Sequence, residues 1–206
     1  EIRAGRLAKL SLLKNAGMNP FPIESGRDFE LATIKADFEK LSAKKNDVTI
    51  AGRIMAIRGQ GAIQFIPLFD GTGTFQAVIK KDVLDPKLFE LFGATVDIGD
   101  IVEVSGDLFL TQKGEKSLQV KSWKMLAKSL RPLPEKWNGL QDVEERFRRR
   151  YLDTVMSEEV RNRFVIRSKT VTAMRAFLDR AGYLEVETPA LQPLAGGTNA
   201  EPSKNH

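Results

Sequence analysis

Apolar residues recur every three or four positions in the first 45 residues, which is the spacing of amphipathic helices. Residues 3–16 predict a short helix, with Gly17 as its C-terminal cap. Residues 28–45 predict a second helix, after the helix-breaking segment Asn19-Pro20-Phe21-Pro22. The apolar stripes consist of Leu7, Leu10 and Leu13 in the first helix, and of Leu31, Ile34, Phe38 and Leu41 in the second. We expect the second stripe to pack against the domain that follows.

From Val48 onward the apolar spacing changes to two, which is typical of strands with one buried face. Turns rich in glycine separate the runs. The runs predict five strands and one helix, at residues 48–56, 62–69, 74–79, 101–111 and 116–125 for the strands and 86–92 for the helix. Five strands with a helix between the third and fourth are the layout of the OB-fold, a small closed barrel that binds single-stranded nucleic acids or oligosaccharides.

The second and third strands are joined by the turn Asp70-Gly71-Thr72-Gly73, which predicts that Phe69 pairs with Thr74. In that register an almost wholly apolar face forms, and we expect it to line the barrel core. It comprises Gln64, Ile66 and Leu68 opposite Ile79, Ala77 and Phe75. Pro67 lies in the same strand and has no N–H to donate, which predicts an edge or a bulge at this position.

The opposite face of this hairpin predicts a binding site. Phe65 points outward, opposite Val78, and Gln76 lies diagonal to it on the same face. An aromatic ring can stack on an unstacked RNA base while an amide bonds the Watson–Crick edge of that base. The alternative is an exposed phenylalanine that packs on Pro67 and has no ligand.

Beyond the barrel, a connector leads into a second helical region. Pro132, Pro134 and Gly139 predict an extended segment. The basic run that follows, Arg146 and residues 148–150, is usually a solvated surface. Residues 158–180 then predict a long helix that ends at Gly182, and residues 183–189 alternate like a strand that stops at Pro189.

Composition narrows the function classes. A net charge of +5 favours a nucleic-acid partner, although a basic balance can also serve solubility alone. The chain has no cysteine, and its one histidine is His206, so disulfides, thiolate nucleophiles and cysteine-ligated zinc are excluded. No apolar run approaches a membrane span and residues 1–17 lack the core of a signal peptide, so we expect a cytoplasmic protein. No P-loop or nucleophile–base set predicts an independent reaction.

The connector carries a resemblance to a known family. Residues 126–153 have the sequence LAKSLRPLPEKWNGLQDVEERFRRRYLD, which closely resembles the connector of the lysyl-tRNA synthetases. In that family an RPLPxKxxGLxDxExRxRxRYLD pattern joins the anticodon-binding barrel to the class II catalytic domain. The resemblance therefore implies a mainly β fold with α. It predicts an N-terminal helical segment at 1–47, an OB-fold anticodon-binding domain at 48–127, a linker at 128–153, and the start of a class II α/β catalytic domain at 154–206.

The resemblance also implies roles for individual residues. Phe65 and Gln76 match the positions that contact the middle uridine of the anticodon. Arg58 and Glu115 match positions near the anticodon bases, although they could otherwise be a surface charge and a turn residue. Residues 158–189 resemble motif 1, the helix and strand that build the homodimer interface, with Gly182 and Pro189 at matching positions. Gly197 matches a glycine whose carbonyl contacts the α-amino group of the bound lysine, unless it belongs to a flexible turn.

The whole enzyme implied by the resemblance is a lysine–tRNA ligase that uses ATP and Mg²⁺. Motifs 2 and 3, which hold these groups, have no counterpart in the sequence, so we expect this portion to recognise tRNA and to dimerise without catalysing. It is expected to contain no catalytic residue, metal ligand or bound cofactor, and to bind neither membranes nor DNA. Two alternatives stay open: a stand-alone OB-fold module that binds RNA or regulates, and an aspartyl-type or asparaginyl-type synthetase.

Overall fold

The computed structural model describes residues 1–59, 61–134 and 140–189. Contacts divide the chain into two compact units, Glu1–Gln141 and Asp142–His206. Within the described ranges, no helix combines the length and the apolar character needed to span a membrane.

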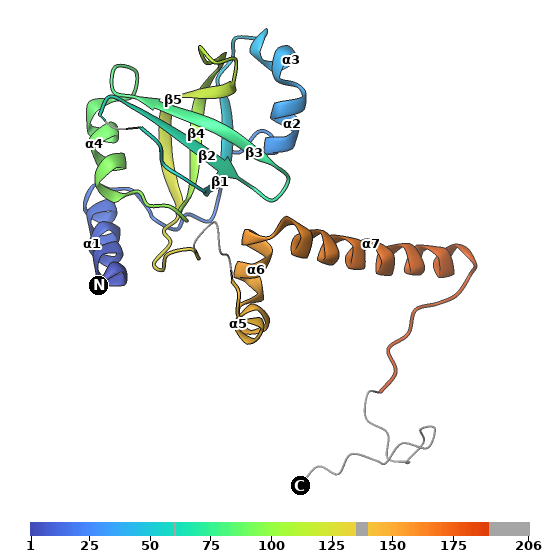
Figure 1. Cartoon of the computed structure of the whole chain (residues 1–206). Helices are drawn as coiled ribbons and strands as arrows, with labels where there is room; N and C mark the ends of the chain where they lie inside the picture. Colours follow the sequence, from blue (N-terminus) through green and yellow to red (C-terminus); the bar gives the residue numbers. More distant parts are fainter. Residues whose placement is uncertain (60, 135–139, 190–206) are drawn as a thin grey trace. The chain divides into compact units, whose positions relative to one another are not determined.

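The first unit is built on a closed barrel of five strands in the order β1-β2-β3-β5-β4 (Figure 1). The strands are β1 (Val48–Ile54), β2 (Ile63–Phe69), β3 (Thr74–Lys80), β4 (Ile101–Leu110) and β5 (Lys116–Ala127). A parallel pairing of β3 with β5 closes the barrel, and all its other pairings are antiparallel. Helix α4 (Pro86–Thr95) lies between β3 and β4, so the predicted OB-fold is confirmed.

The predicted hairpin register is confirmed. Phe69 pairs with Thr74, and the opposing pairs continue back to Ile63 and Lys80. Ile66, Leu68, Phe75, Ala77 and Ile79 are buried in the core. Pro67 fits because its carbonyl accepts from Met55 N at 3.0 Å, which places its missing N–H on the β1 side, just beyond the end of β1. The ladder between β2 and β3 therefore loses nothing at Pro67.

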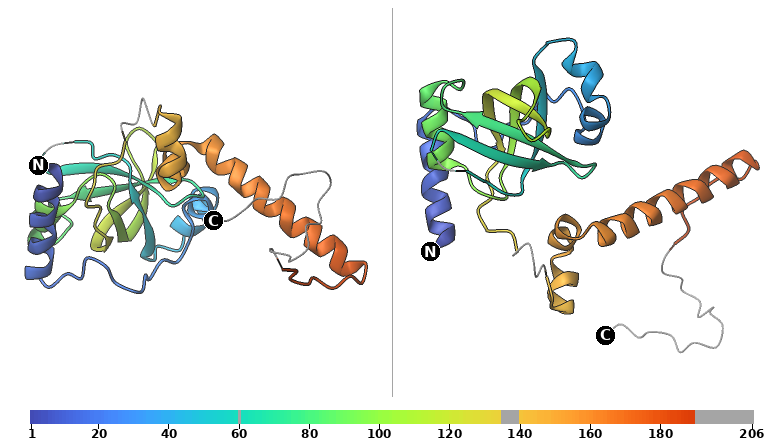
Figure 2. Two further views of the ribbon diagram at one scale, coloured as in Figure 1. Left: turned by 90° about the horizontal axis from the view of Figure 1, so that it is seen from below. Right: turned by 45° about the horizontal axis from the view of Figure 1, so that its top comes forward.

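Three helices precede the barrel: α1 (Ile2–Asn15), α2 (Leu31–Ala36) and α3 (Phe38–Ser42). Helix α1 lies beside α4, and α2 with α3 lies on the other side of the barrel (Figures 1 and 2). The prediction of one helix over 28–45 is wrong. Asp28 instead exchanges hydrogen bonds with Thr49 of β1, so the helix begins only at Leu31, and the backbone leaves helical geometry again at Asp37. The predicted apolar stripe is nevertheless buried in both short helices.

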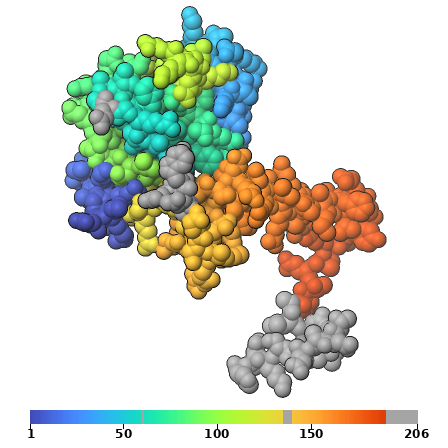
Figure 3. All heavy atoms as spheres, viewed as in Figure 1, coloured from blue at the N-terminus to red at the C-terminus, as the bar shows by residue number. Residues whose placement is uncertain are grey.

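A buried ionic cluster joins the two ends of this unit. The Lys128 ammonium donates to Asp97 Oδ2 at 2.5 Å and to Asp100 Oδ2 at 2.8 Å, and the side chains of Lys128 and Asp100 are fully buried. Arg6 of α1 donates to the carbonyls of Ile98, Ser129 and Arg131. Part of the basic side of α1 is therefore engaged inside the protein, where α1 abuts α4 (Figure 3).

Over residues 142–189, which are described, the second unit contains three helices, α5 (Val143–Arg148), α6 (Arg150–Met156) and α7 (Glu158–Arg180). Helix α7 has the predicted bounds, and Ser157 caps it by accepting a hydrogen bond from Val160 N. The predicted strand at 183–189 is not formed. Those residues have no regular secondary structure, because the described chain offers no neighbouring strand to complete their hydrogen bonds.

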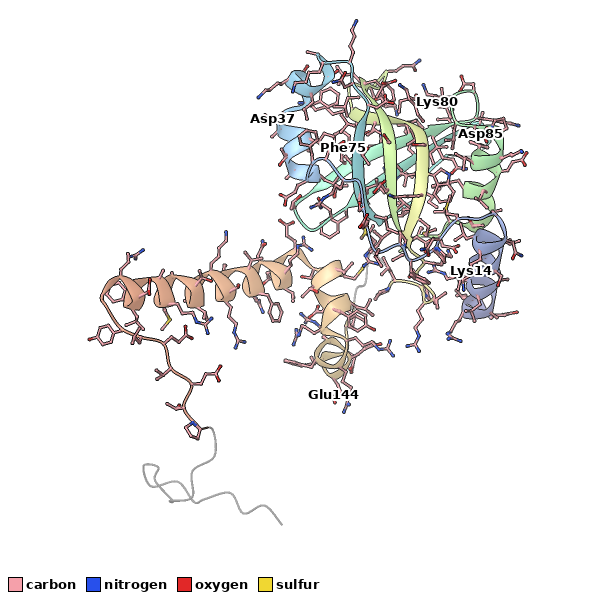
Figure 4. All side chains as sticks on the ribbon, turned by 180° about the vertical axis from the view of Figure 1, so that it is seen from behind. Lys14, Asp37, Phe75, Lys80, Asp85 and Glu144 are labelled. Carbon is pink, nitrogen blue, oxygen red and sulfur yellow. The ribbon has the colours of Figure 1, made fainter. Side chains whose placement is uncertain are left out.

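The basic run lies on α5 and α6, and each of its arginines has an acidic partner within this unit. Two pairs converge on Asp153, whose side chain is 5% exposed, and two join residues one turn apart on α5 (Glu144 is labelled in Figure 4). The pairs are Arg146–Asp153, Arg150–Asp153, Arg148–Glu144 and Arg149–Glu145. These ion pairs largely neutralise the charge of the basic run, as its interpretation as a solvated surface predicts.

We predict that Lys128→Met lowers the free energy of unfolding by about 3–5 kcal/mol, because the fully buried Asp100 carboxylate would lose its ion-pair partner. Urea unfolding monitored by tryptophan fluorescence measures this. Lys121→Met of β5 is the matched control, because Lys121 is 43% exposed and pairs with Asp47 and Asp107 at the surface. Its denaturation midpoint should hardly change, and an equal loss in both variants would contradict the role given to the buried cluster.

We also predict that stability falls as the pH drops below about 4.5. Burial by itself raises the pKa of Asp70, Asp97 and Glu103, but hydrogen bonds outweigh it and hold each pKa below its ordinary value. Since the unfolded carboxyls take up protons first, stability is complete above their ordinary pKa values of 3.8 to 4.5 and is lost toward the lower folded values. Urea midpoints measured across this range test the prediction, and a flat profile would refute it.

Candidate nucleic-acid interface

A hollow on the outer face of the barrel brings together all four residues predicted to read an anticodon. Its volume is about 500 Å³. It is lined by the predicted Arg58, Phe65, Gln76 and Glu115, together with Ile63, Val78, Lys80, Phe109, Thr111, Gln112 and Lys113. The lining comes from β2, β3, β4, the β4–β5 turn and the segment after β1.

Phe65 and Arg58 are placed by backbone hydrogen bonds. Strand β1 ends at Ile54, so Arg58 lies beyond it. Arg58 instead forms an isolated bridge with Phe65, with N···O distances of 3.0 and 2.8 Å. On its other side Phe65 pairs with Val78, so the half-buried ring is held between two neighbours at one side of the hollow. This bridge brings the guanidinium and the aromatic ring to the same site.

The Gln76 amide has a defined orientation. The Ser117 hydroxyl is 3.2 Å from the carbonyl of Glu115, to which it can donate its proton, and 2.9 Å from Gln76 Nε2. Since that proton is used on Glu115, the hydroxyl accepts from the amide, and Nε2 must be the atom that faces it. Gln76 Oε1 has no partner among the described residues, so it is the acceptor available to a ligand.

The charge of the hollow favours a polyanion. Three cations line it, Arg58, Lys80 and Lys113, against one carboxylate, Glu115. Lys80 lies at the end of β3 that leads to α4 (Figure 4), and its ammonium is 5.2 Å from the centre of the Phe109 ring. Cations beside an aromatic surface suit the phosphates and bases of a single strand.

Phe109, Lys80 and the turn residues are site residues that sequence reasoning missed. The register shift between Ser105 and Gly106 places the extra residue, Lys121, in β5, so β4 itself keeps its alternation of inward and outward positions. The run Leu108-Phe109-Leu110 is apolar throughout, but counting by twos from the apolar Val102 and Val104 marks Leu108 as inward and Phe109 as outward, a signal that the sequence interpretation did not use. Nothing in the sequence marks Lys80 as a site residue, because its place beside Phe109 depends on the closure of the barrel.

The other predicted residues are not among those that line this hollow. Gly182 follows α7 with a φ of +83°, a left-handed conformation that glycine adopts without strain, and Pro189 is exposed. Gly197 lies outside the described residues. Among residues 1–59, 61–134 and 140–189, no group of three or more acidic or histidine side chains could hold a metal ion.

Comparison with known proteins agrees with this architecture. Residues 48–126 match the family described as OB-fold nucleic acid binding domain, and residues 142–205 match the family described as tRNA synthetases class II (D, K and N). The barrel thus matches a nucleic-acid-binding family, and the segment after it matches the class II tRNA synthetases of the D, K and N group.

Curated relatives narrow the class. The chain is 45% identical over its whole length to the lysine–tRNA ligase of Syntrophomonas wolfei, covering 41% of that protein. It is 44% identical over its whole length to the enzyme of Moorella thermoacetica, covering 42%, and 46% identical over 98% of its length to that of Carboxydothermus hydrogenoformans, covering 41%. The chain belongs to the lysyl-tRNA synthetase family and spans about two fifths of the length of these relatives.

Proposed function

We propose that this chain is the tRNA-recognition and dimerisation portion of a cytoplasmic lysine–tRNA ligase, an enzyme that attaches lysine to its tRNA with ATP and Mg²⁺. The observation that carries the proposal is the hollow, where Phe65, Gln76, Arg58 and Glu115 meet on one face of the barrel. The family matches and the names of the relatives support the same function.

The hollow suggests how a uridine would be read. The base stacks on Phe65, and Gln76 Oε1 accepts the N3–H of uracil. The second proton of Nε2 donates to the neighbouring uracil carbonyl. Cytosine presents the reverse pattern, with an acceptor at N3 and a donor beside it, so a fixed amide rejects it. Ser117 and the Glu115 carbonyl supply that fixation.

Arg58 and Glu115 complete the proposed contacts. The Arg58 side chain is exposed at the rim beside Phe65, where it can bond a phosphate or an adjacent base. Glu115 offers a carboxylate to the donors of a neighbouring base. Neither ATP nor Mg²⁺ enters this account of anticodon binding.

The proposed homodimer rests on the exposed side of α7. Three apolar side chains of α7, Phe164, Met174 and Leu178, are 43–61% exposed. The stripe from Phe164 to Leu178 extends along about 21 Å of the helix. A long apolar stripe left in water marks a contact surface, and motif 1 of the family provides the partner, a second copy of the chain.

We predict that Phe65→Ala weakens binding of an anticodon stem-loop by about 1–3 kcal/mol, because the base loses its stacking surface. Fluorescence anisotropy with a stem-loop carrying the lysine anticodon UUU measures this. Phe21→Ala is the matched control, since Phe21 is 49% exposed and does not line the hollow. A second stem-loop with cytidine in the middle position should bind more weakly to the wild-type chain at low and at high salt. Equal binding of the two stem-loops, removed by salt in both cases, would identify a general RNA binder instead.

We predict that Leu178→Glu shifts the chain from dimer to monomer in sedimentation equilibrium, because a charge would be buried in the apolar contact. Lys169→Glu is the control on the same helix, nine residues away and therefore on the side opposite Leu178. The control should sediment like the wild-type chain. A wild-type chain that is monomeric throughout would refute the proposed dimer contact.

A further inference from the structure

The connector leaves the barrel without support from the sheet. Strand β5 ends at Ala127, and residues 128–134 have no regular secondary structure. The polar backbone groups of such a segment need other partners. Some come from the loop between α4 and β4: the Ser129 N–H donates to Asp100 Oδ1 at 2.7 Å, and a Cβ on Gly99 would lie only 3.1 Å from Ser129 Oγ. The start of the connector is therefore packed closely on this loop.

One arginine of the N-terminal helix holds the carbonyls of the same segment. Arg6 Nη1 donates to the carbonyls of Ser129 and Arg131 at 2.9 and 3.0 Å. Its Nη2 donates to the carbonyl of Ile98, in the loop between α4 and β4, at 3.0 Å. Arg6 is only 8% exposed, and the planar fork of its guanidinium suits several acceptors at once. A single side chain thus joins α1, the loop and the connector.

Helix α1 has few other attachments to the barrel. Of its 14 residues, only Arg6 and Leu13 are buried. Lys9 adds an ion pair with Asp97 at 2.6 Å, but its side chain is 33% exposed, so water and salt weaken the pair. An element with so few buried contacts opens more readily than the sheet beside it. Docking of α1 and attachment of the connector therefore depend on the same guanidinium.

We propose that Arg6 and its three carbonyl acceptors form a clasp that couples the docking of α1 to the connector. While α1 is docked, the clasp fixes the direction in which the chain leaves the barrel at residues 129–131. When α1 opens, the connector is released with it. Arg6 is a positioning residue in this device, since it acts through the connector backbone and does not line the hollow. The inference goes beyond the proposed function and does not depend on it.

Hydrogen exchange of the Ser129 amide, followed by NMR in the full chain, measures opening of the connector. Arg6→Gln should accelerate this exchange roughly 10- to 100-fold, because the carbonyls lose their charged donor. The paired amides of β4 and β5 report opening of the barrel, and their exchange should change far less. Wild-type exchange at Ser129 in Arg6→Gln would overturn the clasp, as would an equal acceleration in both strands.

Leu13→Ala tests the coupling from the other end of the helix. Leu13 is fully buried and lies about two turns from Arg6, so its truncation weakens the docking of α1 and leaves the guanidinium in place. Because coupling is reciprocal, Ser129 exchange should be faster in this variant as well. Unchanged exchange at Ser129 would mean that the connector opens independently of α1, and would overturn the proposal.

Lys9→Gln is the matched control. It removes a cation from the same helix, while Asp97 keeps its partner Lys128 and the connector keeps Arg6. The Ser129 amide should exchange as in the wild-type chain. An acceleration equal to that in Arg6→Gln would assign the effect to the lost charge and overturn the clasp.

Two further measurements separate the clasp from a general loss of structure. If Arg6→Gln does not fold, Arg6→Lys replaces it, since lysine keeps the charge but lacks the planar fork. Faster Ser129 exchange in that variant supports the clasp, and wild-type exchange overturns it. Anticodon stem-loop binding by the folded variant should match that of the wild-type chain, because no residue of α1 lines the hollow. Weakened binding would show that the change reaches the barrel, and would overturn an action confined to the connector.

Discussion

The site depends on the parallel pairing of β3 with β5, which closes the barrel. This ladder contains only three residue pairs, Gln76 with Ser117, Ala77 with Leu118 and Val78 with Gln119. Its inward-facing pair, Ala77 and Leu118, is buried in the core, which holds the two strands together. The outward pair Gln76 and Ser117 is thereby brought into hydrogen-bonding contact. Burial on one side of the ladder thus determines the orientation of a binding group on the other side.

The ionic groups of this protein serve mainly to hold it together. Arg6, Lys9 and Lys128 are all engaged around Asp97 and Asp100, and the arginines of α5 and α6 pair with acids of their own unit. A net charge of +5 therefore does not locate a binding surface. What distinguishes the hollow is the combination of three cations with two aromatic rings and one oriented amide. The positions of the charged residues therefore indicate the binding surface, whereas the net charge does not.

The two units present different kinds of surface. In the first unit, polar groups with defined hydrogen bonds line the hollow, and these favour selection of one ligand over another. In the second unit, α7 exposes an apolar stripe with few directional groups, which favours association. The proposed division of labour between recognition and dimerisation follows from this difference in chemistry.

Much of the fold could be predicted from sequence because it depends on local periodicity. The alternation around the turn Asp70-Gly71-Thr72-Gly73 determined the register of β2 and β3, and with it the outward positions of Phe65 and Gln76. The bounds of α7 were predictable because acidic residues mark its first turn and Gly182 follows its C-terminus. Only the tertiary structure decided the placement of Arg58, which depends on a backbone bridge to another strand, and the closure of the barrel that brings Phe109 of β4 to the same hollow as Phe65 of β2. It also decided that residues 183–189 form no strand, because strands require hydrogen-bonding partners that a sequence pattern cannot supply.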